Sequence, residues 1–548
     1  MSDEVVIRAY APVLLSAREL AGCEHRVALD HGAAAIAPGA VARDGEDPSV
    51  VRRKEAAAAH RERVRELVTT TADGHVRIEA ATTQARVDAT VHALEAGAAR
   101  IWNAMLPADR VAGRRGGSEL LIRVDDGYVP VIVVNHRVSE PAAAGNAERP
   151  VAEQRFVLSS PLHTWAPARD TTRALRNHRR DLLRLGHLQR LLAVAGHGSA
   201  CGLGGVIGLD ADCVVVHDLV ACADSYDETF ARRGAIAAGQ VPTRPSRVGE
   251  CRSCAWWPVC ERQLVAARDV SLVLGGGQVT GARLAGLDTV DALAAHTGPP
   301  PDEWSDGVFA DAVVLARAWL RDVPLVRRVV APEITRADIE VDVDMESFGE
   351  DGAYLWGTLL TDTTDPTRPV RYRPFVTWDP LPTVDEARSF AQFWAWLSAE
   401  RAAAHAAGRT FAAYCYSQQA ENRWLLGSAR RFHGIAGVPT ESEVQAFIDS
   451  PEWVDVYEAV GDAFICPKGK GLKKIAPVAG FDWRDSEAGG EASMDWYRLA
   501  VGLDGTMIDA TQRDRLLRYN EDDVWATKVL REWMSSSAVT DVPHVDDV

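Results

Sequence analysis

The sequence predicts a mixed α/β protein made of two domains and a small helical connector, and three observations lead to this prediction. The chain has 548 residues, whereas one domain usually has roughly 100–200. Hydrophobic residues make up 47% and charged residues 25%, which excludes a disordered, collagen-like or disulfide-scaffold chain. A proline-rich segment, PPPDEWSD (299–306), separates the two halves. We therefore expect domains over residues 1–265 and 331–548, with the connector over 266–330.

The net charge of −17, from 77 acidic and 60 basic residues, argues against nucleic acid or membrane binding over the whole surface. It does not exclude nucleic acid, because carboxylates can hold metal ions and basic side chains can cluster. The N-terminus has no basic segment before an apolar run, and no stretch of about 18 uncharged apolar residues occurs. We expect a cytoplasmic protein without membrane contact, whose cysteines are reduced thiols or metal ligands.

Four cysteines predict a metal centre in the N-terminal domain. Cys251, Cys254 and Cys260 have the spacing C-x2-C-x5-C, which lets three thiolates converge on one metal or cluster. A tetrahedral site or a cubane cluster needs a fourth ligand, and Cys23 is the candidate. Zinc is the generic interpretation of four such cysteines. The other cysteines stand singly in apolar surroundings and are expected to be buried small side chains: Cys201, Cys213, Cys222, Cys415 and Cys466.

This combination of one N-terminal cysteine with a distant C-terminal triplet resembles the iron–sulfur staple of RecB-like nucleases, which have a PD-(D/E)XK fold. The resemblance implies a 4Fe–4S cluster on the four cysteines, with zinc as the alternative. Two segments between the cysteines also resemble this family. Residues 56–67 (AAAAHRERVREL) resemble its histidine helix, with His60, and residues 116–137 resemble its catalytic hairpin, with a turn at Asp125-Asp126-Gly127.

The predicted hairpin lacks most of this family's catalytic residues. The family carries an acid on the first strand and D/E-x-K on the second, where the carboxylates hold a divalent metal. Glu119 takes the first position, but Ile132 and Val134 replace the second acid and the lysine. We therefore expect an inactive nuclease fold that binds nucleic acid, in which His60 and Glu119 support the fold. An active site with a rearranged metal is the alternative.

A run of arginines in the same domain predicts a phosphate-binding surface. Their spacing of three or four residues would place them on one face of a helix, which suits contact with a nucleic-acid backbone. The alternative is a solvated face that pairs with the surplus acids. The arginines are Arg169, Arg173, Arg176, Arg180 and Arg184.

The connector is predicted to be helical. Residues 273–296 have the pattern of a helix, a glycine turn and a second helix. This pattern is similar to helix-hairpin-helix units, which hold the DNA backbone; a plain helical connector is the alternative. Residues 309–329 predict a further helix with one apolar face.

Acidic residues on a predicted strand mark the C-terminal domain. Residues 337–346 and 353–362 have the pattern of two successive strands. Residues two apart on a strand point to the same side, so Asp342, Asp344 and Glu346 would share a face. Burying three acids is very costly without a metal or protonation. The first strand is therefore either part of a metal site or an exposed edge.

A helix predicted over residues 518–533 adds to this pattern, because it places Tyr519 and Asp523 on one face. Asp522 lies about 100° round the helix and is the less suitable ligand. Together with the strand acids, this Y-x3-D pattern resembles the DEDDy branch of DnaQ-like 3′–5′ exonucleases. The resemblance implies a ribonuclease H-like fold with a mixed sheet.

Three segments between the strand and the helix resemble the same group. Residues 411–426 resemble its second motif, with Glu421 where Asp is usual, and residues 453–460 supply Asp455. Residues 469–483 (GKGLKKIAPVAGFDW) resemble an S-L-K…G-F segment, with Gly instead of Ser.

The resemblance implies two-metal hydrolysis of phosphodiester bonds, with Mg²⁺ or Mn²⁺ ions about 4 Å apart. Tyr519 would orient the attacking water. The expected ligands are Asp344, Glu346 and Asp523, together with Glu421 or Asp455.

Four lysines fall in the glycine-punctuated segment CPKGKGLKK, which suits a loop that follows a nucleic-acid backbone; a solubilising loop is the alternative. These are Lys468, Lys470, Lys473 and Lys474.

The sequence therefore predicts a metal-dependent nuclease of DNA or RNA. We expect 3′–5′ exonuclease activity from the C-terminal domain, while the N-terminal domain binds single strands or ends. The alternative is a non-catalytic nucleic-acid-binding scaffold with two degenerate nuclease folds.

Overall fold

The computed structural model describes residues 12–32, 48–69, 74–142, 150, 153–304, 307–487 and 489–548. The first eleven residues and two residues of the proline-rich segment, 305–306, lie outside the described residues. The chain divides into two compact units, which we call the N-terminal unit (1–266) and the C-terminal unit (267–548). In the described part of the chain, no helix is long and apolar enough to span a membrane.

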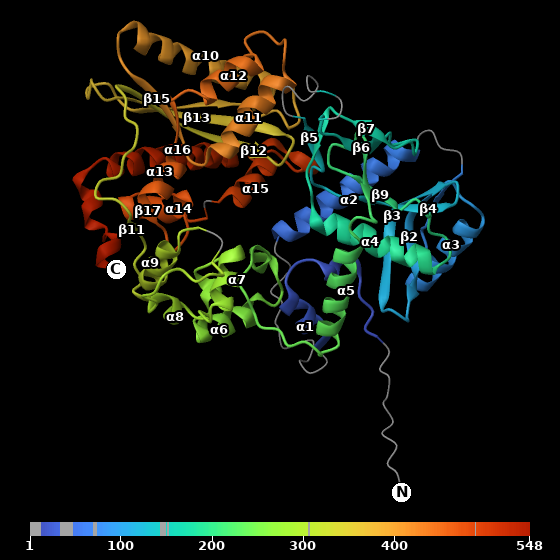
Figure 1. The fold of residues 1–548 in the computed structure, drawn as a ribbon. Helices are drawn as coiled ribbons and strands as arrows, with labels where there is room; N and C mark the ends of the chain where they lie inside the picture. The colour runs from blue at the N-terminus through green and yellow to red at the C-terminus, as the bar shows by residue number, and fades with distance from the viewer. Residues whose placement is uncertain are drawn as a thin grey trace. The chain divides into compact units, whose positions relative to one another are not determined.

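The N-terminal unit contains a mixed sheet, which in the described residues has the strand order β1-β2-β3-β4-β9-β10-β6-β7 (Figure 1). The β1–β2 and β4–β9 pairs are parallel and the others are antiparallel. The predicted hairpin is confirmed as β3 and β4. The strands are β1 (His75–Arg77), β2 (Arg100–Asp109), β3 (Arg114–Val124), β4 (Gly127–Val133), β6 (Val157–Ser160), β7 (Ala168–Asp170), β9 (Leu203–Ile207) and β10 (Val214–Asp218).

Helices cover both faces of this sheet, because its strands alternate apolar side chains on two sides. Leu185, Leu188 and Leu191 of α4 (Arg179–Val194) pack on one face. On the other face lie Val64 and Val68 of α2 (Pro48–Thr69), the helix predicted to carry His60. The remaining helices of this unit are α1 (Glu24–Gly32), α3 (Thr83–Glu95), α5 (Ala223–Ala237) and α6 (Trp257–Ala267).

The prediction of one helix carrying all five arginines is wrong. Arg169 lies in β7, and Arg173 lies in β8 (Arg173–Leu175), which pairs with β5 (Ser139–Pro141). Between these strands the Asp170 carboxylate accepts hydrogen bonds from the backbone N–H and the hydroxyl of Thr172, which holds a turn. The helix α4 starts only at Arg179, so it carries Arg180 and Arg184 alone.

The C-terminal unit begins with helices. The predicted helix–turn–helix is confirmed: α7 (Gly276–Leu284) and α8 (Val290–Ala294) flank a turn at Gly286, whose φ is +76°. The helix predicted over 309–329 is too long. The helix α9 (Phe309–Leu320) ends before Asp322, whose φ is +54°. The strand β11 (Val326–Arg327), which pairs with β17 (Phe464–Ile465), follows.

A five-stranded sheet in the described residues forms the centre of this unit, in the order β14-β13-β12-β15-β16. The pairs β12–β13 and β13–β14 are antiparallel, whereas β12–β15 and β15–β16 are parallel. Both strands predicted over 337–362 are confirmed. The strands are β12 (Ile339–Phe348), β13 (Gly352–Asp362), β14 (Arg371–Val376), β15 (Phe411–Cys415) and β16 (Trp453–Asp455).

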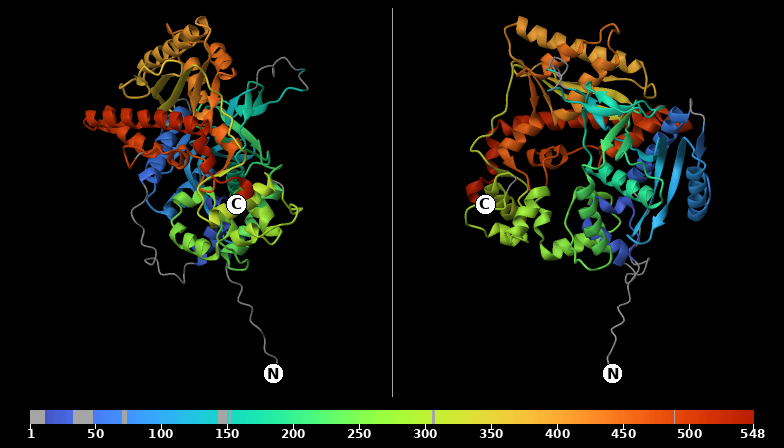
Figure 2. Two further views of the ribbon diagram at one scale, coloured as in Figure 1. Left: turned by 90° about the vertical axis from the view of Figure 1, so that its left-hand side faces the viewer. Right: turned by 45° about the vertical axis from the view of Figure 1, so that its right-hand side comes forward.

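Two helical layers enclose this sheet (Figure 2). On one side, Val341, Val343 and Met345 of β12 pack against α10 (Asp385–Ala406), α11 (Gln418–Arg431) and α12 (Glu441–Ile448). The acidic side of β12 faces the other layer, through contacts with α16. This layer comprises α13 (Val456–Ala463), α14 (Leu472–Ile475), α15 (Gly490–Val501) and α16 (Ala510–Met534).

Candidate metal centre

Three carboxylates meet where α16 crosses β12. Asp344, Glu346 and Asp523 each offer an oxygen, and these atoms lie within 4.8 Å of one another. In the described part of the chain, no other His, Cys, Asp or Glu side chains form such a group. We call these three residues the acid centre. The strand places the first two on one side, and the helix brings the third against them.

The acid centre concentrates negative charge away from water. Glu346 and Asp523 are buried, and Asp344 is partly exposed. Removal from water, followed by repulsion from Asp523 and Glu346, raises the pKa of Asp344 well above its usual value. Burial and Asp523 likewise raise the pKa of Glu346. Carboxylates in this situation are stabilised by protonation or by a cation, and carboxylate oxygens are preferred ligands of Mg²⁺ and Mn²⁺.

Neighbouring donors hold each carboxylate in place. Asn520 Nδ2 donates to Asp344 Oδ2 at 2.7 Å, and Trp483 Nε1 donates to Asp523 Oδ1 at 2.7 Å. Ser493 Oγ donates to Glu346 Oε2 at 3.2 Å. Each contact orients a carboxylate in the way that outer contacts orient metal ligands. Sequence reasoning missed all three donors, although Asn520 and Trp483 lie inside segments already singled out.

Tyr519 and Lys473 extend this network. Lys473 Nζ lies 3.2 Å from Tyr519 Oη and 4.4 Å from the centroid of the Tyr519 ring. The Tyr519 hydroxyl in turn bonds the Asp523 carboxylate. Burial, followed by the charges of Glu346 and Asp523, raises the pKa of Tyr519 far above its usual value. The hydroxyl therefore stays protonated beside the carboxylates, and Lys473 supplies a positive charge there.

Glu421 lies in the first turn of α11, the helix that follows β15, and Asp455 is the last residue of β16. Glu421 is buried, its Oε2 has no hydrogen-bond partner, and burial raises its pKa to about 8. Asp455 has a different environment. Its carboxylate accepts from the backbone N–H groups of Ser417, Gln418 and Tyr457 at 2.9, 3.0 and 2.9 Å. Glu421 thus has a free oxygen near the acid centre, whereas the oxygens of Asp455 cap two helices.

Two further acids are neutralised by arginine. Asp342, on the same face as the acid centre, pairs with fully buried Arg531 at 2.8 Å. Asp522 pairs with Arg484 at 2.6 Å. Neither Asp342 nor Asp522 belongs to the acid centre. For Asp522 this matches the expectation from the sequence, which placed it on a different side of the helix from Asp523.

Of the four lysines in the basic segment, only Lys473 lies at the acid centre. Lys468 pairs with Asp322 at 2.9 Å, and Lys470 Nζ lies 3.7 Å from the centroid of the Tyr457 ring. Lys474 is exposed.

In the N-terminal unit, Glu119 forms an ion pair with Arg184 at 2.5 Å. Ile132 is buried on β4 and Val134 follows that strand, so the hairpin places no carboxylate or lysine at these positions. His60 is buried beside the backbone at Gly208 and Val134, and burial lowers its pKa.

Most of the predicted phosphate-binding arginines pair with acids. Arg173 pairs with Asp170 and Asp212, and Arg176 pairs with Glu140. These pairs match the alternative of a solvated, ion-paired face. Arg180 is exposed and lines a cavity.

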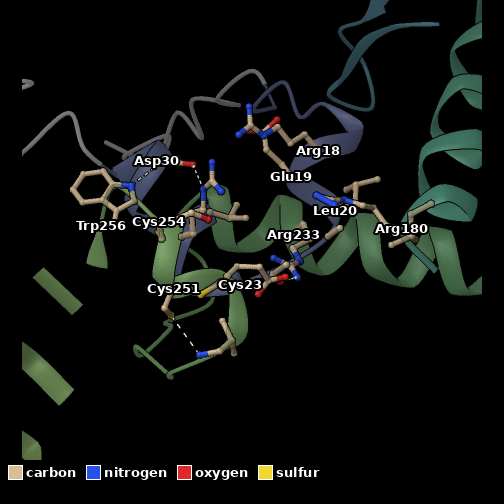
Figure 3. A pocket seen from close by; sticks show the side chains of 18 of the residues that line it. Arg18, Glu19, Leu20, Cys23, Asp30, Arg180, Arg233, Cys251, Cys254 and Trp256 are labelled. Atoms are coloured by element: carbon tan, nitrogen blue, oxygen red, sulfur yellow. Dashed lines mark hydrogen bonds and ion pairs between the residues drawn. The ribbon is translucent and has the colours of Figure 1, made fainter. Parts of the chain in front are cut away.

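The same cavity collects the four predicted cysteine ligands. Cys23 lies just before α1, and Cys260 lies on α6. Cys251 lies in a short 3-10 helix (Gly249–Ser253), and Cys254 follows it. All four line this cavity, and Figure 3 shows Cys23, Cys251 and Cys254 there. Burial and then the other three thiols raise the pKa of Cys260 to about 11. The fold therefore brings together cysteines that are more than two hundred residues apart in the sequence.

Comparison with protein-family models places part of the C-terminal unit in a known superfamily. Residues 430–535 match a family model of the RNase H superfamily. The C-terminal unit contains a ribonuclease H-like domain. The match covers Asp455, Lys473, Tyr519 and Asp523, and an RNase H-like fold is a nuclease-type, metal-dependent fold. No curated protein matches the chain.

Proposed function

We propose that this protein is a metal-dependent nuclease whose C-terminal unit hydrolyses phosphodiester bonds of DNA or RNA as a 3′–5′ exonuclease. The acid centre carries this proposal. Three carboxylates, two of them buried, face one another without an arginine partner in an RNase H-like domain. The neighbouring acids of the same strand, in contrast, are paired with Arg531.

The residues of the acid centre fit Mg²⁺ or Mn²⁺, because they supply hard oxygen ligands with excess negative charge. Asp344, Glu346 and Asp523 would hold the metal, and Glu421 is the candidate fourth ligand. Bound divalent ions would stabilise charge on the attacking and leaving oxygens. The Tyr519 hydroxyl orients the attacking water, while Lys473 fixes that hydroxyl and offsets part of the negative charge.

The test uses single-stranded DNA and RNA labelled at the 5′ end, with Mn²⁺. We expect stepwise shortening that a 3′ phosphorothioate block prevents and a 5′ block does not. Metal coordination contributes several kcal/mol to catalysis, so Asp344→Asn and Asp523→Asn should each reduce the rate by about 100-fold or more. The control Asp514→Asn changes an exposed acid on the same helix and should leave the rate unchanged. If neither DNA nor RNA is cleaved, the result would instead favour the non-catalytic scaffold.

We also propose that Cys23, Cys251, Cys254 and Cys260 hold an iron–sulfur cluster in a RecB-like N-terminal unit that binds nucleic acid. All four thiols line one cavity of the N-terminal unit, and four cysteine thiolates are the ligand set of a 4Fe–4S cluster. Absorbance near 400 nm, matched by iron and sulfide, should disappear in Cys254→Ser. A colourless protein with stoichiometric zinc would contradict the cluster.

A further inference from the structure

A buried arginine stands at the cavity that holds the four cysteines. Arg233, on α5, is only 7% exposed. Its Nη2 donates to the carbonyl oxygen of Gly22 at 2.6 Å, whereas its Nη1 is buried without a hydrogen-bond partner. A buried donor without an acceptor costs about 1–3 kcal/mol, and more when it is charged. The Nη1 amino group of the Arg233 guanidinium is therefore buried without an acceptor in the protein.

The surroundings of Arg233 point to the missing acceptor. Gly22 directly precedes Cys23, so the Nη2 bond fixes the loop that carries this thiol. Arg233 and Cys23 both line the cavity (Figure 3), and the charge of Arg233 interacts with the Cys23 thiol. The acid next to Cys23 in the sequence, Glu24, interacts with Arg233 through its charge, but its two oxygens accept hydrogen bonds of 2.6 Å from Arg232.

The charge of the proposed centre fits such a cation. Four thiolates carry four negative charges, and either Zn²⁺ or an oxidised 4Fe–4S core offsets only two of them. The complex therefore keeps two negative charges at a partly buried site. Hydrogen bonds to the sulfurs and nearby fixed charges set the reduction potential and the stability of such centres.

We propose that Arg233 is a positioning residue for this metal centre: its Nη1–H donates to the metal-bound thiolate of Cys23, and its charge stabilises the centre. The inference rests on the proposed metal centre. It assigns a role to an arginine outside the C-x2-C-x5-C pattern, on a helix that supplies no ligand.

The test compares the full-length protein with Arg233→Met, Arg233→Lys and Arg232→Met, all purified without oxygen. Metal, iron and sulfide contents are measured first. For an iron–sulfur protein, the midpoint potential is followed by visible absorbance; for a zinc protein, the rate of zinc transfer to 4-(2-pyridylazo)resorcinol is measured. Arg233→Met should lower the midpoint potential or, with zinc, release metal about 10-fold faster. Arg233→Lys keeps the charge and should show less than half of either effect.

The neighbouring exposed residue supplies the matched control, because Arg232→Met removes a cation that pairs with Glu24 and should behave like the wild type. A loaded Arg233→Met protein with wild-type potential and release rate, or equal effects in Arg232→Met, would overturn the role of Arg233. Wild-type protein that binds neither iron nor zinc would overturn the metal centre itself. If Arg233→Met does not fold, the metal content of Arg233→Lys decides: a folded Arg233→Lys protein that binds no metal would contradict the charge argument.

Discussion

The buried guanidinium of Arg531 pairs with two acids of β12 and leaves the other two without an arginine partner. Arg531 is fully buried and pairs with both Glu340 and Asp342. Two residues further along the same face, Asp344 and Glu346 have amide and hydroxyl donors instead. Since a fixed guanidinium already neutralises one half of the acidic face, an external cation is needed only for the other half.

Removing this guanidinium should be strongly destabilising. Arg531→Met leaves the buried Asp342 carboxylate without its cation, whereas Glu340 keeps its ion pair with Arg336 at 2.6 Å. Breaking a buried pair from one side costs about 3–5 kcal/mol. Urea unfolding of the metal-free protein measures this loss. The double variant Arg531→Met, Asp342→Asn also removes the unpaired carboxylate and should recover most of the stability. A single variant as stable as the wild type would contradict the pairing.

His187 gives a pH dependence to the N-terminal unit. It is fully buried on α4, where it contacts the Tyr226 hydroxyl and the Arg115 carbonyl at 3.0 Å each. Burial lowers its pKa from 6.5 to about 4. The unfolded chain therefore binds a proton below pH 6.5 that the folded chain resists. The associated stability is complete above pH 6.5 and is lost as the pH falls towards 4.

Between pH 7.5 and pH 5 the wild type should lose about 2 kcal/mol through this residue, because each pKa unit corresponds to about 1.4 kcal/mol. The asparagine side chain of the His187→Asn variant does not titrate. Over the same pH range, this variant should therefore lose about 2 kcal/mol less stability than the wild type. Urea unfolding at the two pH values gives the comparison. Identical pH dependence of the two proteins would show that His187 keeps its ordinary pKa.

At the scale of elements, the acid centre depends on how α11 starts. Ser417 has φ +74°, a left-handed conformation that is unfavourable for a residue other than glycine. The Asp455 carboxylate binds the N–H groups of Ser417 and Gln418 and also caps α13. This one side chain therefore holds the turn from which α11 presents Glu421.

We therefore expect Asp455 to act as a cap rather than as a metal ligand. Asp455→Ala should cost about 1–2 kcal/mol in stability, as for other helix caps, with Mn²⁺ affinity nearly unchanged. Asp344→Asn should instead lose Mn²⁺ binding, measured by calorimetry, with little loss of stability. Loss of Mn²⁺ binding in Asp455→Ala equal to that in Asp344→Asn would make Asp455 a ligand.

Strong local patterns predicted the elements that carry the acid centre. The alternating strand at Asp344 and the helix at Asp523 follow from periodicity, because both patterns are local. The arginine run does not form one helix, because equal spacing also fits a strand–turn–strand segment, and Asp170 holds that turn. Nothing local indicates that Trp483 and Asn520 orient two of the carboxylates, since these contacts arise only when separate segments pack together.

At the scale of the whole molecule, the two units are each built like a domain. The N-terminal unit has its own sheet with buried side chains on both faces, and the C-terminal unit has the RNase H-like sheet between two helical layers. All four cysteines lie in the first unit, and the whole acid centre lies in the second. The proposed metal centre and the proposed nuclease site should therefore be separable.

Expression of residues 1–266 and 267–548 as separate proteins tests this separation. The second fragment should unfold cooperatively and degrade single-stranded substrate with Mn²⁺, and Asp344→Asn should abolish that activity. The first fragment should bind its metal and retain nucleic acid in a filter-binding assay without cleaving it. Its affinity should fall with rising salt, because phosphate contacts release counterions. A full-length protein that cleaves substrate while the folded fragment 267–548 does not would show that catalysis requires the N-terminal unit.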